Sequence, residues 1–327
     1  MATSHNTTVP IVFGAMTFGT KGVEATCVHT LEECSMILDV FQKHGHLEID
    51  TALIYGEGSS EQYLGQLNWQ DRGFIIETKF SPKLKASRHG LAPDVKVTHG
   101  PEHLRIALRK SLESLKTEKI DMWYLHAPER STPFETTLRK INNLYMAQMC
   151  EICDQNGWIK PAVYQGLYNA FHRAIEPELI PYLRYYGIAL YAFNPLAGGY
   201  LTSRYVRNML TEDTGIGEGS RFDPKRKQAQ NYRLRSFNNK YFDALDILRD
   251  VAKKHSLPEA ECALRWISHH SLLNRSHGDV IIIGASSAAQ LEGNLTNLEK
   301  GPLPEDVVEA LEEGWKTVRG VCMTYWH

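Results

Sequence analysis

Short apolar runs that are typical of buried strands alternate along this chain with longer segments in which apolar residues recur at helical spacing. In segment 30–44, for example, apolar residues stand three or four positions apart, and Gly45 follows, as glycine commonly does after a helix. Alternation of strands and helices predicts a parallel α/β fold.

Seven runs of the chain predict strands, and a closed barrel of parallel strands has eight. The predicted strands are 11–16, 47–52, 74–79, 120–126, 162–166, 188–193 and 280–284. The predicted helices are 30–44, 60–67, 101–115, 133–145, 146–155, one near 176–177, 240–255, 258–269, one from 287, and 305–318. Nothing between segments 133–145 and 146–155 predicts a strand. Segment 211–237 is polar and rich in Gly and Arg, which predicts a long loop that carries function or covers a site.

Composition limits the classes of protein to consider. A chain of 327 residues suffices for one large barrel or two ordinary domains, and 43% hydrophobic with 23% charged residues predicts a full core. The net charge of −2 gives no reason to expect a nucleic-acid partner. No apolar run approaches the roughly 20 residues that span a bilayer. The first residues lack the basic start and apolar stretch of a secretory signal, so a cytoplasmic location is expected.

Six scattered cysteines are too few for a disulfide scaffold and fit a reducing cytosol. Cys150 and Cys153 have the C-x-x-C spacing of redox and metal motifs, but they lie in a predicted helix without a second pair or a nearby His cluster. We therefore expect buried helix positions and no metal site.

Polar residues follow three successive predicted strands: Asp50 and Tyr55, then Lys79, then His126. In a barrel of parallel strands, the C-terminal strand ends meet at one mouth, where catalytic groups collect. Each residue alone has an ordinary interpretation, such as a strand-end cap, a solvated charge or a structural histidine. Together, an acid, a phenol, an ammonium and an imidazole can protonate a carbonyl oxygen while a hydride reaches its carbon.

Three glycine-containing segments resemble loops that bind cofactors, and two of them remain candidates. Segment 284–287 joins a strand to a helix N-terminus, which is a ready anion site, although Ser286 and Ser287 could also cap the helix. Segment 194–199 follows a strand and could be a cofactor loop or a plain turn. Segment 56–61 begins like a dinucleotide fingerprint but lacks the third glycine and follows the second strand, so we predict a loop before a helix and no Rossmann domain.

These segments together resemble the aldo-keto reductases, in particular the aflatoxin-aldehyde reductase branch, from about residue 10 to 325. The motifs that carry the resemblance are GAMTFG at 14–19, EIDTA at 48–52 with Tyr55, GSSE at 58–61, TK at 78–79, YLH at 124–126, VYQG at 163–166, YAFNPLAGG at 191–199, and GASS at 284–287 with Gln290 and Asn294.

The resemblance implies a (β/α)8 TIM barrel, a single domain over residues 1–327, that binds NADPH and reduces an aldehyde or ketone to an alcohol in detoxification or secondary metabolism. Tyr55 would be the general acid. Lys79 would lower the pKa of the phenol, because a nearby positive charge favours the phenolate. Asp50 would hold Lys79, and His126 would orient the substrate carbonyl. The implied partner is a small carbonyl compound, with no nucleic acid or membrane, and the implied state is a monomer or homodimer.

The resemblance also implies the cofactor contacts. Gln165 would lie beside the nicotinamide. Asn194, Leu196 and Gly198 would follow the pyrophosphate, and Ser286, Gln290 and Asn294 would surround the adenosine phosphates. Arg204 and Arg221 would also bind the cofactor, with Arg221 in the long loop.

The chain departs from the family at two places. Between residues 145 and 146 it lacks a segment that comprises the fifth strand and a Ser-Asn pair for the nicotinamide carboxamide. Strand 5 is thus absent or the barrel is rearranged, through evolution or an error in the gene model. The chain also ends without the arginine that meets acidic substrates, which favours a bulkier apolar carbonyl. The missing segment motivates two alternatives: an impaired or non-enzymatic NADP(H)-binding barrel that acts as a partner subunit, and a disrupted product that folds poorly.

Overall fold

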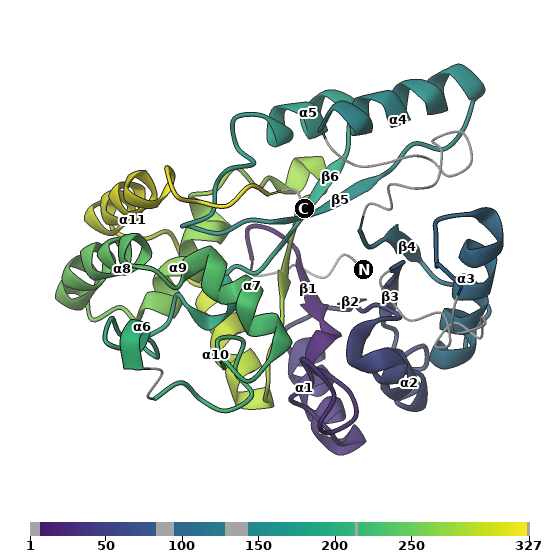
Figure 1. The fold of residues 1–327 in the computed structure, drawn as a ribbon, viewed down its shortest axis with the longest axis horizontal. Helices are drawn as coiled ribbons and strands as arrows, with labels where there is room; N and C mark the ends of the chain where they lie inside the picture. Colours follow the sequence, from purple (N-terminus) through teal and green to yellow (C-terminus); the bar gives the residue numbers. More distant parts are fainter. Residues whose placement is uncertain (1–6, 83–94, 128–142, 213–214, 326–327) are drawn as a thin grey trace. The chain divides into compact units, whose positions relative to one another are not determined.

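The computed structural model describes residues 7–82, 95–127, 143–212 and 215–325 (Figure 1). The chain forms two compact units. We call residues 12–161 and 284–291 the N-terminal unit, and residues 1–11, 162–283 and 292–327 the C-terminal unit.

Four parallel strands run through the N-terminal unit in the order β4-β3-β2-β1. They are β1 (Ile11–Gly14), β2 (Glu48–Asp50), β3 (Ile75–Phe80) and β4 (Met122–Leu125). The helices of this unit are α1 (Leu31–Lys43), α2 (Ser59–Gln66), α3 (Pro101–Leu115) and α4 (Asn143–Asn156), with short 3-10 helices η1 (Ala15–Thr17) and η2 (Tyr55–Gly58). Gly14 lies opposite Asp50, and Asp50 lies opposite Glu77, so neighbouring strands end at a common edge.

Local signals fix the predicted helix ends. Thr30 and Glu33 form a reciprocal capping box at the start of α1, which satisfies two free N–H groups. Gly45, with φ +82°, follows the helix in a left-handed conformation. Pro101 occupies the first turn of α3, where its missing N–H costs nothing. The predictions of helices at 30–44 and 101–115 are confirmed.

Three parallel strands run through the C-terminal unit in the order β7-β6-β5. They are β5 (Val163–Leu167), β6 (Ala189–Phe193) and β7 (Val280–Ile283). The helices are α5 (Leu179–Tyr186), α6 (Met209–Glu212), α7 (Lys227–Ser236), α8 (Asn239–Ala252), α9 (Glu259–His269) and α11 (Glu305–Val318), with 3-10 helices η4 (Ala197–Gly199), η5 (Lys253–His255) and η6 (Arg275–His277). Helix α10 (Ala288–Leu298) begins in the N-terminal unit and ends in the C-terminal unit. Helices α8 and α11 pack against each other (Figure 1).

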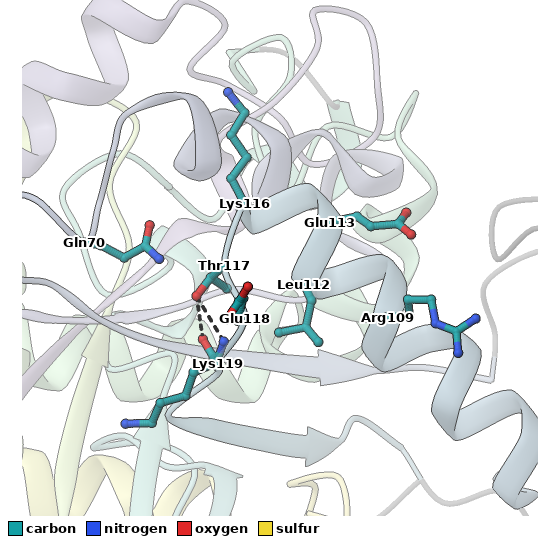
Figure 2. A pocket seen from close by; sticks show the side chains of 8 residues that line it. All are labelled: Gln70, Arg109, Leu112, Glu113, Lys116, Thr117, Glu118 and Lys119. Carbon is teal, nitrogen blue, oxygen red and sulfur yellow. Dashed lines mark hydrogen bonds between the residues drawn. The ribbon is translucent and has the colours of Figure 1, made fainter.

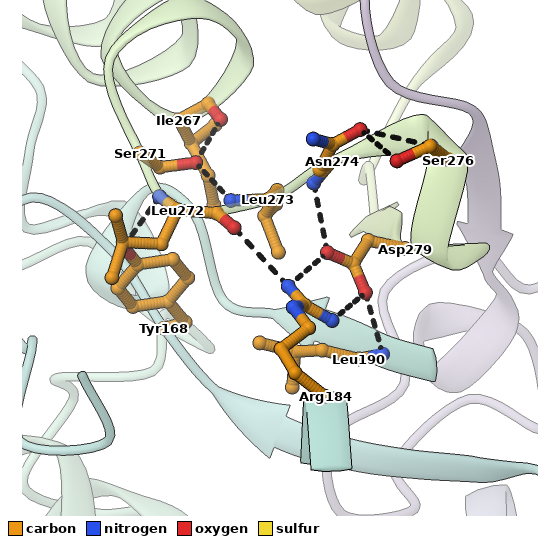
Figure 3. Close-up of polar contacts among 10 residues, drawn as sticks. All are labelled: Tyr168, Arg184, Leu190, Ile267, Ser271, Leu272, Leu273, Asn274, Ser276 and Asp279. Carbon is orange, nitrogen blue, oxygen red and sulfur yellow. Dashed lines mark hydrogen bonds and ion pairs between the residues drawn. The ribbon is translucent and has the colours of Figure 1, made fainter. Parts of the chain in front are cut away.

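A buried ion pair ties α5 to the starts of β6 and β7 (Figure 3). Asp279 is fully buried and accepts hydrogen bonds from Arg184 Nη1 at 2.9 Å and Nη2 at 2.5 Å. The backbone N–H groups of Leu190 and Asn274 donate to the same carboxylate at 2.9 and 2.8 Å. Both carboxylate oxygens of Asp279 thus have hydrogen-bond partners, and the Arg184 guanidinium compensates its negative charge inside the protein.

The strand count agrees with the sequence prediction, with seven strands in the described residues. Between β4 and β5 the described part of the chain holds one helix, α4, which runs through positions 145 and 146 without interruption. The predicted helix at 133–145 lies for the most part outside the described residues.

Two sequence predictions are wrong. Segment 11–16 is not a strand throughout, because the chain turns into η1 at Ala15, whose carbonyl accepts the N–H of Phe18 at 3.0 Å. Segment 211–237 is not one loop, because it contains the end of α6 and all of α7. Good helix formers such as Lys, Gln, Ala and Arg make up much of α7.

In the described part of the chain, no helix is both long enough and apolar enough to cross a membrane.

Candidate active site

The four predicted catalytic residues all belong to the N-terminal unit. Asp50 is the last residue of β2, Lys79 stands one residue before the end of β3, and His126 directly follows β4. Tyr55 opens η2, which follows β2. Because β2, β3 and β4 are parallel neighbours, their C-terminal ends bring these side chains together.

An ion pair between Lys79 and Asp50 lies at the base of the site. Lys79 Nζ is 2.5 Å from Oδ1 and 2.6 Å from Oδ2 of Asp50, and it donates to the carbonyl of Thr51 at 2.8 Å. The two residues are only 1% and 3% exposed. Burial alone would lower the pKa of Lys79, but the charges of Asp50 and Tyr55 outweigh it and the net pKa is raised. Lys79 is therefore a fixed ammonium in a dry environment.

Tyr55 and His126 complete the group. Lys79 Nζ lies 5.0 Å from the centroid of the Tyr55 ring. The rings of Tyr55 and His126 meet edge to face, with centroids 5.5 Å apart and an interplanar angle of 88°. Both side chains are half-buried, so they can meet a ligand. A cation this close to a phenol favours loss of its proton.

Three successive left-handed residues follow Tyr55: Gly56 (φ +56°), Glu57 (φ +54°) and Gly58 (φ +97°). The Ser59 hydroxyl closes this turn by donating to the Gly56 carbonyl at 2.6 Å. A Cβ atom at Gly56 would approach the Phe18 carbonyl to 3.2 Å, so glycine is required. The turn leads into α2, which confirms the predicted loop before a helix.

Two further side chains approach the ion pair and were not predicted from the sequence. Glu77 stands two residues before Lys79, is fully buried, and accepts a hydrogen bond from the Tyr124 hydroxyl at 2.9 Å. Tyr124 lies opposite Lys79 in the strand register, with its ring centroid 5.8 Å from Nζ. Strand alternation could have identified both, because residues i and i+2 of a strand share a face.

The predicted cofactor residues of the C-terminal unit lie on β5 and after β6. Gln165 is on β5, opposite Tyr191. Asn194 adopts a left-handed conformation (φ +68°), and its carbonyl accepts from Asn169 Nδ2 at 3.1 Å. The carbonyl of Leu196 accepts two backbone N–H groups and holds the turn that contains η4.

Gly198 and Arg221 both contact Tyr232 on α7, a residue that the sequence did not predict to be part of the site. Arg221 Nη1 donates to the Tyr232 hydroxyl at 2.6 Å, and the guanidinium carbon lies 5.2 Å from the ring centroid. Gly198 has φ +73°, and a Cβ atom there would lie 2.5 Å from the Tyr232 ring. The wrong prediction of a loop at 211–237 concealed this contact.

Arg204 does not join this cluster. It lies exposed, and its backbone N–H donates to the Thr202 hydroxyl at 3.3 Å. Within the described residues, no hydrogen bond or ring contact links it to Gly198 or Arg221.

Ser286 and Gln290 are joined at the start of α10. Gln290 Oε1 accepts from the Ser286 N–H at 2.7 Å and from its hydroxyl at 2.9 Å. Ser287 caps the helix by accepting the Gln290 N–H at 3.2 Å. Thr17 donates to the Ala285 carbonyl at 2.7 Å, which anchors this loop just beyond β1.

Asn294 lies one turn further along α10 and is 6% exposed. Its Nδ2 is a buried donor without a hydrogen-bond partner in the described part of the chain. A buried donor of this kind calls for an acceptor. A helix N-terminus and an unsatisfied amide on the same helix fit a phosphate-bearing cofactor.

The open cavity of about 660 Å³ in Figure 2 is not part of this site. It lies where α3 ends and the chain turns toward the start of β4, whereas His126 follows the opposite end of that strand. Charges of both signs line it, as on an ordinary solvated surface, and it contains no predicted site residue. The lining residues are Gln70, Arg109, Leu112, Glu113, Lys116, Thr117, Glu118 and Lys119.

Cys150 and Cys153 are buried on α4, as predicted, and neither forms a disulfide. Burial raises the pKa of both thiols, that of Cys150 to about 11, which makes them poor nucleophiles. Among the described residues, no cluster of three or more His, Cys, Asp or Glu side chains is arranged to hold a metal ion.

Comparison with known proteins defines the class of this fold and site. Residues 10–316 match the Aldo/keto reductase family. An aldo-keto reductase of Pseudocercospora fijiensis is 47% identical over 300 residues, which cover 86% of this chain and 97% of that protein. Aldo-keto reductase pigE of Monascus ruber is 42% identical over 342 residues, with 99% of each chain covered. Aflatoxin B1 aldehyde reductase member 2 of Mus musculus is 37% identical over 312 residues, or 87% of this chain and 80% of that protein.

The parallel α/β fold and these relatives together define the protein as an oxidoreductase of a family with the barrel fold. The chain belongs to the aldo/keto reductase family, whose enzymes reduce carbonyl compounds with nicotinamide cofactors. The alignment with pigE is 342 positions long and exceeds the 327 residues of this chain, so that relative has residues with no counterpart here. This agrees with the predicted loss of a segment. That the lost segment lies between residues 145 and 146 stays a prediction.

Proposed function

We propose that this protein is an NADPH-dependent reductase that converts an aldehyde or ketone into an alcohol. The buried Lys79–Asp50 ion pair against the Tyr55 ring carries the proposal. Bound NADPH would supply the hydride. Tyr55 would donate the proton to the carbonyl oxygen, and the Lys79 ammonium would stabilise the phenolate that remains. His126, at the edge of the Tyr55 ring, would orient the substrate oxygen.

The cofactor would be held by the loops described above. Asn194, Leu196 and Gly198 would follow the pyrophosphate, and Gln165 would meet the nicotinamide. Asn294 would pair its unsatisfied amide with a phosphate oxygen, next to Ser286 and Gln290. The Arg221 guanidinium offers charge to a phosphate, which supports NADPH over NADH.

The substrate would be a bulky apolar carbonyl compound, consistent with a role in detoxification or secondary metabolism. The relative named aflatoxin B1 aldehyde reductase member 2, which is 37% identical, supports an aldehyde substrate. The absence of cysteine pairs supports a reducing compartment such as the cytosol. We further propose that the whole chain forms one barrel domain.

Replacing Tyr55 by phenylalanine tests the chemistry. NADPH oxidation with an aromatic aldehyde should slow about 10²–10⁴-fold, the usual contribution of general acid catalysis, while NADPH binding stays unchanged. Tyr185→Phe, at a residue that is 82% exposed, is the matched control and should keep full activity. Unchanged turnover by Tyr55→Phe would exclude Tyr55 as the proton donor.

The missing segment supports one alternative, a barrel that binds NADP(H) without turnover and serves as a partner subunit. Titration of the purified protein with NADPH, followed by a panel of carbonyl compounds, separates the two. Tight binding with no oxidation of NADPH by any carbonyl compound would favour the alternative.

A further inference from the structure

A third carboxyl group lies on the strand face that carries the Lys79–Asp50 pair. Glu77 and Lys79 are two residues apart on β3 and therefore share a face, as Glu48 and Asp50 do on β2. The register places Asp50 opposite Glu77. Glu77 is fully buried, although Lys79 is already bonded to both oxygens of Asp50.

The charges around Glu77 decide whether its carboxyl group is protonated. The charged and titratable groups near it are Lys79 on its own strand, Glu48 and Asp50 on β2, and Tyr124 on β4. Asp50 and Glu77 are both buried, and the one ammonium is already bonded to both oxygens of Asp50, so a charge on Glu77 would be buried without a cation of its own, which is costly. Burial first, and then the hydrogen bond and charge of Glu48, raise the pKa of Glu77 far above its ordinary value.

A protonated carboxyl group has one donor and retains acceptor capacity. Glu77 can therefore donate to Glu48 and accept from the Tyr124 hydroxyl, which lies 2.9 Å from Oε2. Tyr124 in turn stands opposite Lys79 and faces its ammonium with the ring. The result is a neutral carboxylic acid and a hydroxyl group that share a hydrogen bond beside the Lys79–Asp50 pair.

We propose that Glu77, held as a neutral acid between Glu48 and Tyr124, is a positioning residue that keeps the Lys79 ammonium on Asp50 and against Tyr55. The inference rests on the proposed function. An ionised Glu77 would be a buried carboxylate opposite Asp50 and would compete with Asp50 for the ammonium. A neutral Glu77 does not compete with Asp50, so Nζ stays on Asp50 and near the Tyr55 ring.

Variants of Glu77 and Tyr124 test the proposal. The glutamine in Glu77→Gln is neutral and has both a donor and an acceptor, so kcat should stay within about threefold of the wild type. This change is smaller than the fall that the loss of one neutral hydrogen bond can cause. Glu77→Ala removes both groups and should lower kcat about 10²-fold, the effect of misplacing a catalytic group by about 1 Å. Tyr124→Phe, which retains packing, should lower kcat about tenfold, as the loss of one hydrogen bond can. KM should change little in each.

The matched control is Glu61→Gln. Glu61 is also fully buried in the N-terminal unit, but it bonds to the Thr78 hydroxyl on the other face of β3. Its kcat should equal that of the wild type. A merely structural role for Glu77 would change thermal stability in the variants and leave kcat intact.

Infrared difference spectra give a readout independent of turnover. At pH 7 the wild type should show the carbonyl band of a protonated carboxylic acid that Glu77→Gln lacks. Absence of that band overturns the proposal. The proposal is also overturned if Glu77→Ala and Tyr124→Phe both fold and both retain the kcat of the wild type. It is overturned as well if Glu77→Gln and Glu77→Ala lose activity equally.

Tyr55→Phe, assayed alongside, separates this inference from the proposed function. Inactive Tyr55→Phe with fully active Glu77→Ala and Tyr124→Phe would refute only the role of Glu77. Wild-type activity in Tyr55→Phe, or no turnover by the wild type, would refute the proposed function and this inference with it.

Discussion

Replacing Asp279 by alanine tests the buried network that joins α5, β6 and β7 (Figure 3). The substitution removes an acceptor of four hydrogen bonds, two from Arg184 and one each from Leu190 and Asn274. It leaves a guanidinium that is 19% exposed and two backbone N–H groups without their partner. Removing one member of a buried ion pair costs about 3–5 kcal/mol, so we expect a loss of that size in the free energy of unfolding.

Urea unfolding followed by tryptophan fluorescence measures this loss as a shift in the midpoint at constant slope. Asp154→Ala is the matched control, because Asp154 pairs with Lys160 at 3.0 Å while the side chains are 58% and 41% exposed. Exposed ion pairs contribute about 0–1 kcal/mol, so the control should shift little. Equal midpoints for the two variants would show that the buried network adds no more stability than a surface pair.

Two further substitutions test other parts of the structure. Burial raises the pKa of Glu61 to about 7 from an ordinary value of 4.5, so the unfolded chain releases this proton first and stability falls as the pH rises from about 4.5 to about 7. Glu61→Gln should therefore increase the free energy of unfolding at pH 8 by up to about 3 kcal/mol, seen as a higher melting temperature, and should leave both unchanged at pH 4. An equal gain at the two pH values would rule out ionisation of Glu61 as the cause. Gly198→Ala should displace Tyr232 and raise the Kd for NADPH about tenfold, or about 1.4 kcal/mol. Gly199→Ala has the same left-handed strain without a neighbour within 4 Å, and an equal loss there would remove Tyr232 from the explanation.

The sequence predicted elements best where local signals are strong. Helix α3 begins at Pro101, and its bounds and those of α11 agree with the prediction. Helix α7 was missed because only Ala229 and Ser236 are buried in it, so no apolar stripe marks it. Its stability comes in part from tertiary contacts of Tyr232 with Arg221 that no local pattern reveals.

The candidate catalytic residues could be predicted because strand ends of a parallel sheet converge, and Asp50, Lys79 and His126 stand at such ends. Their environment was harder to predict. The proposed neutral state of Glu77 depends on which carboxyl groups share one face with the Lys79 ammonium, and this requires the register of β2, β3 and β4. Arg204 was assigned by resemblance alone and lies outside the cluster of Gly198 and Arg221.

Helix α4 separates two stretches of chain with different tasks. The proposed proton-transfer residues all precede it, between positions 50 and 126, and the proposed cofactor residues all follow it, between 165 and 294. A deletion at this helix would remove a strand and the Ser-Asn pair that the resemblance implies, while it leaves every residue of these two sets in place. Evolution could therefore shorten this chain by a single event and still leave both halves of the chemistry encoded, which makes α4 the natural place to graft the segment of a longer relative.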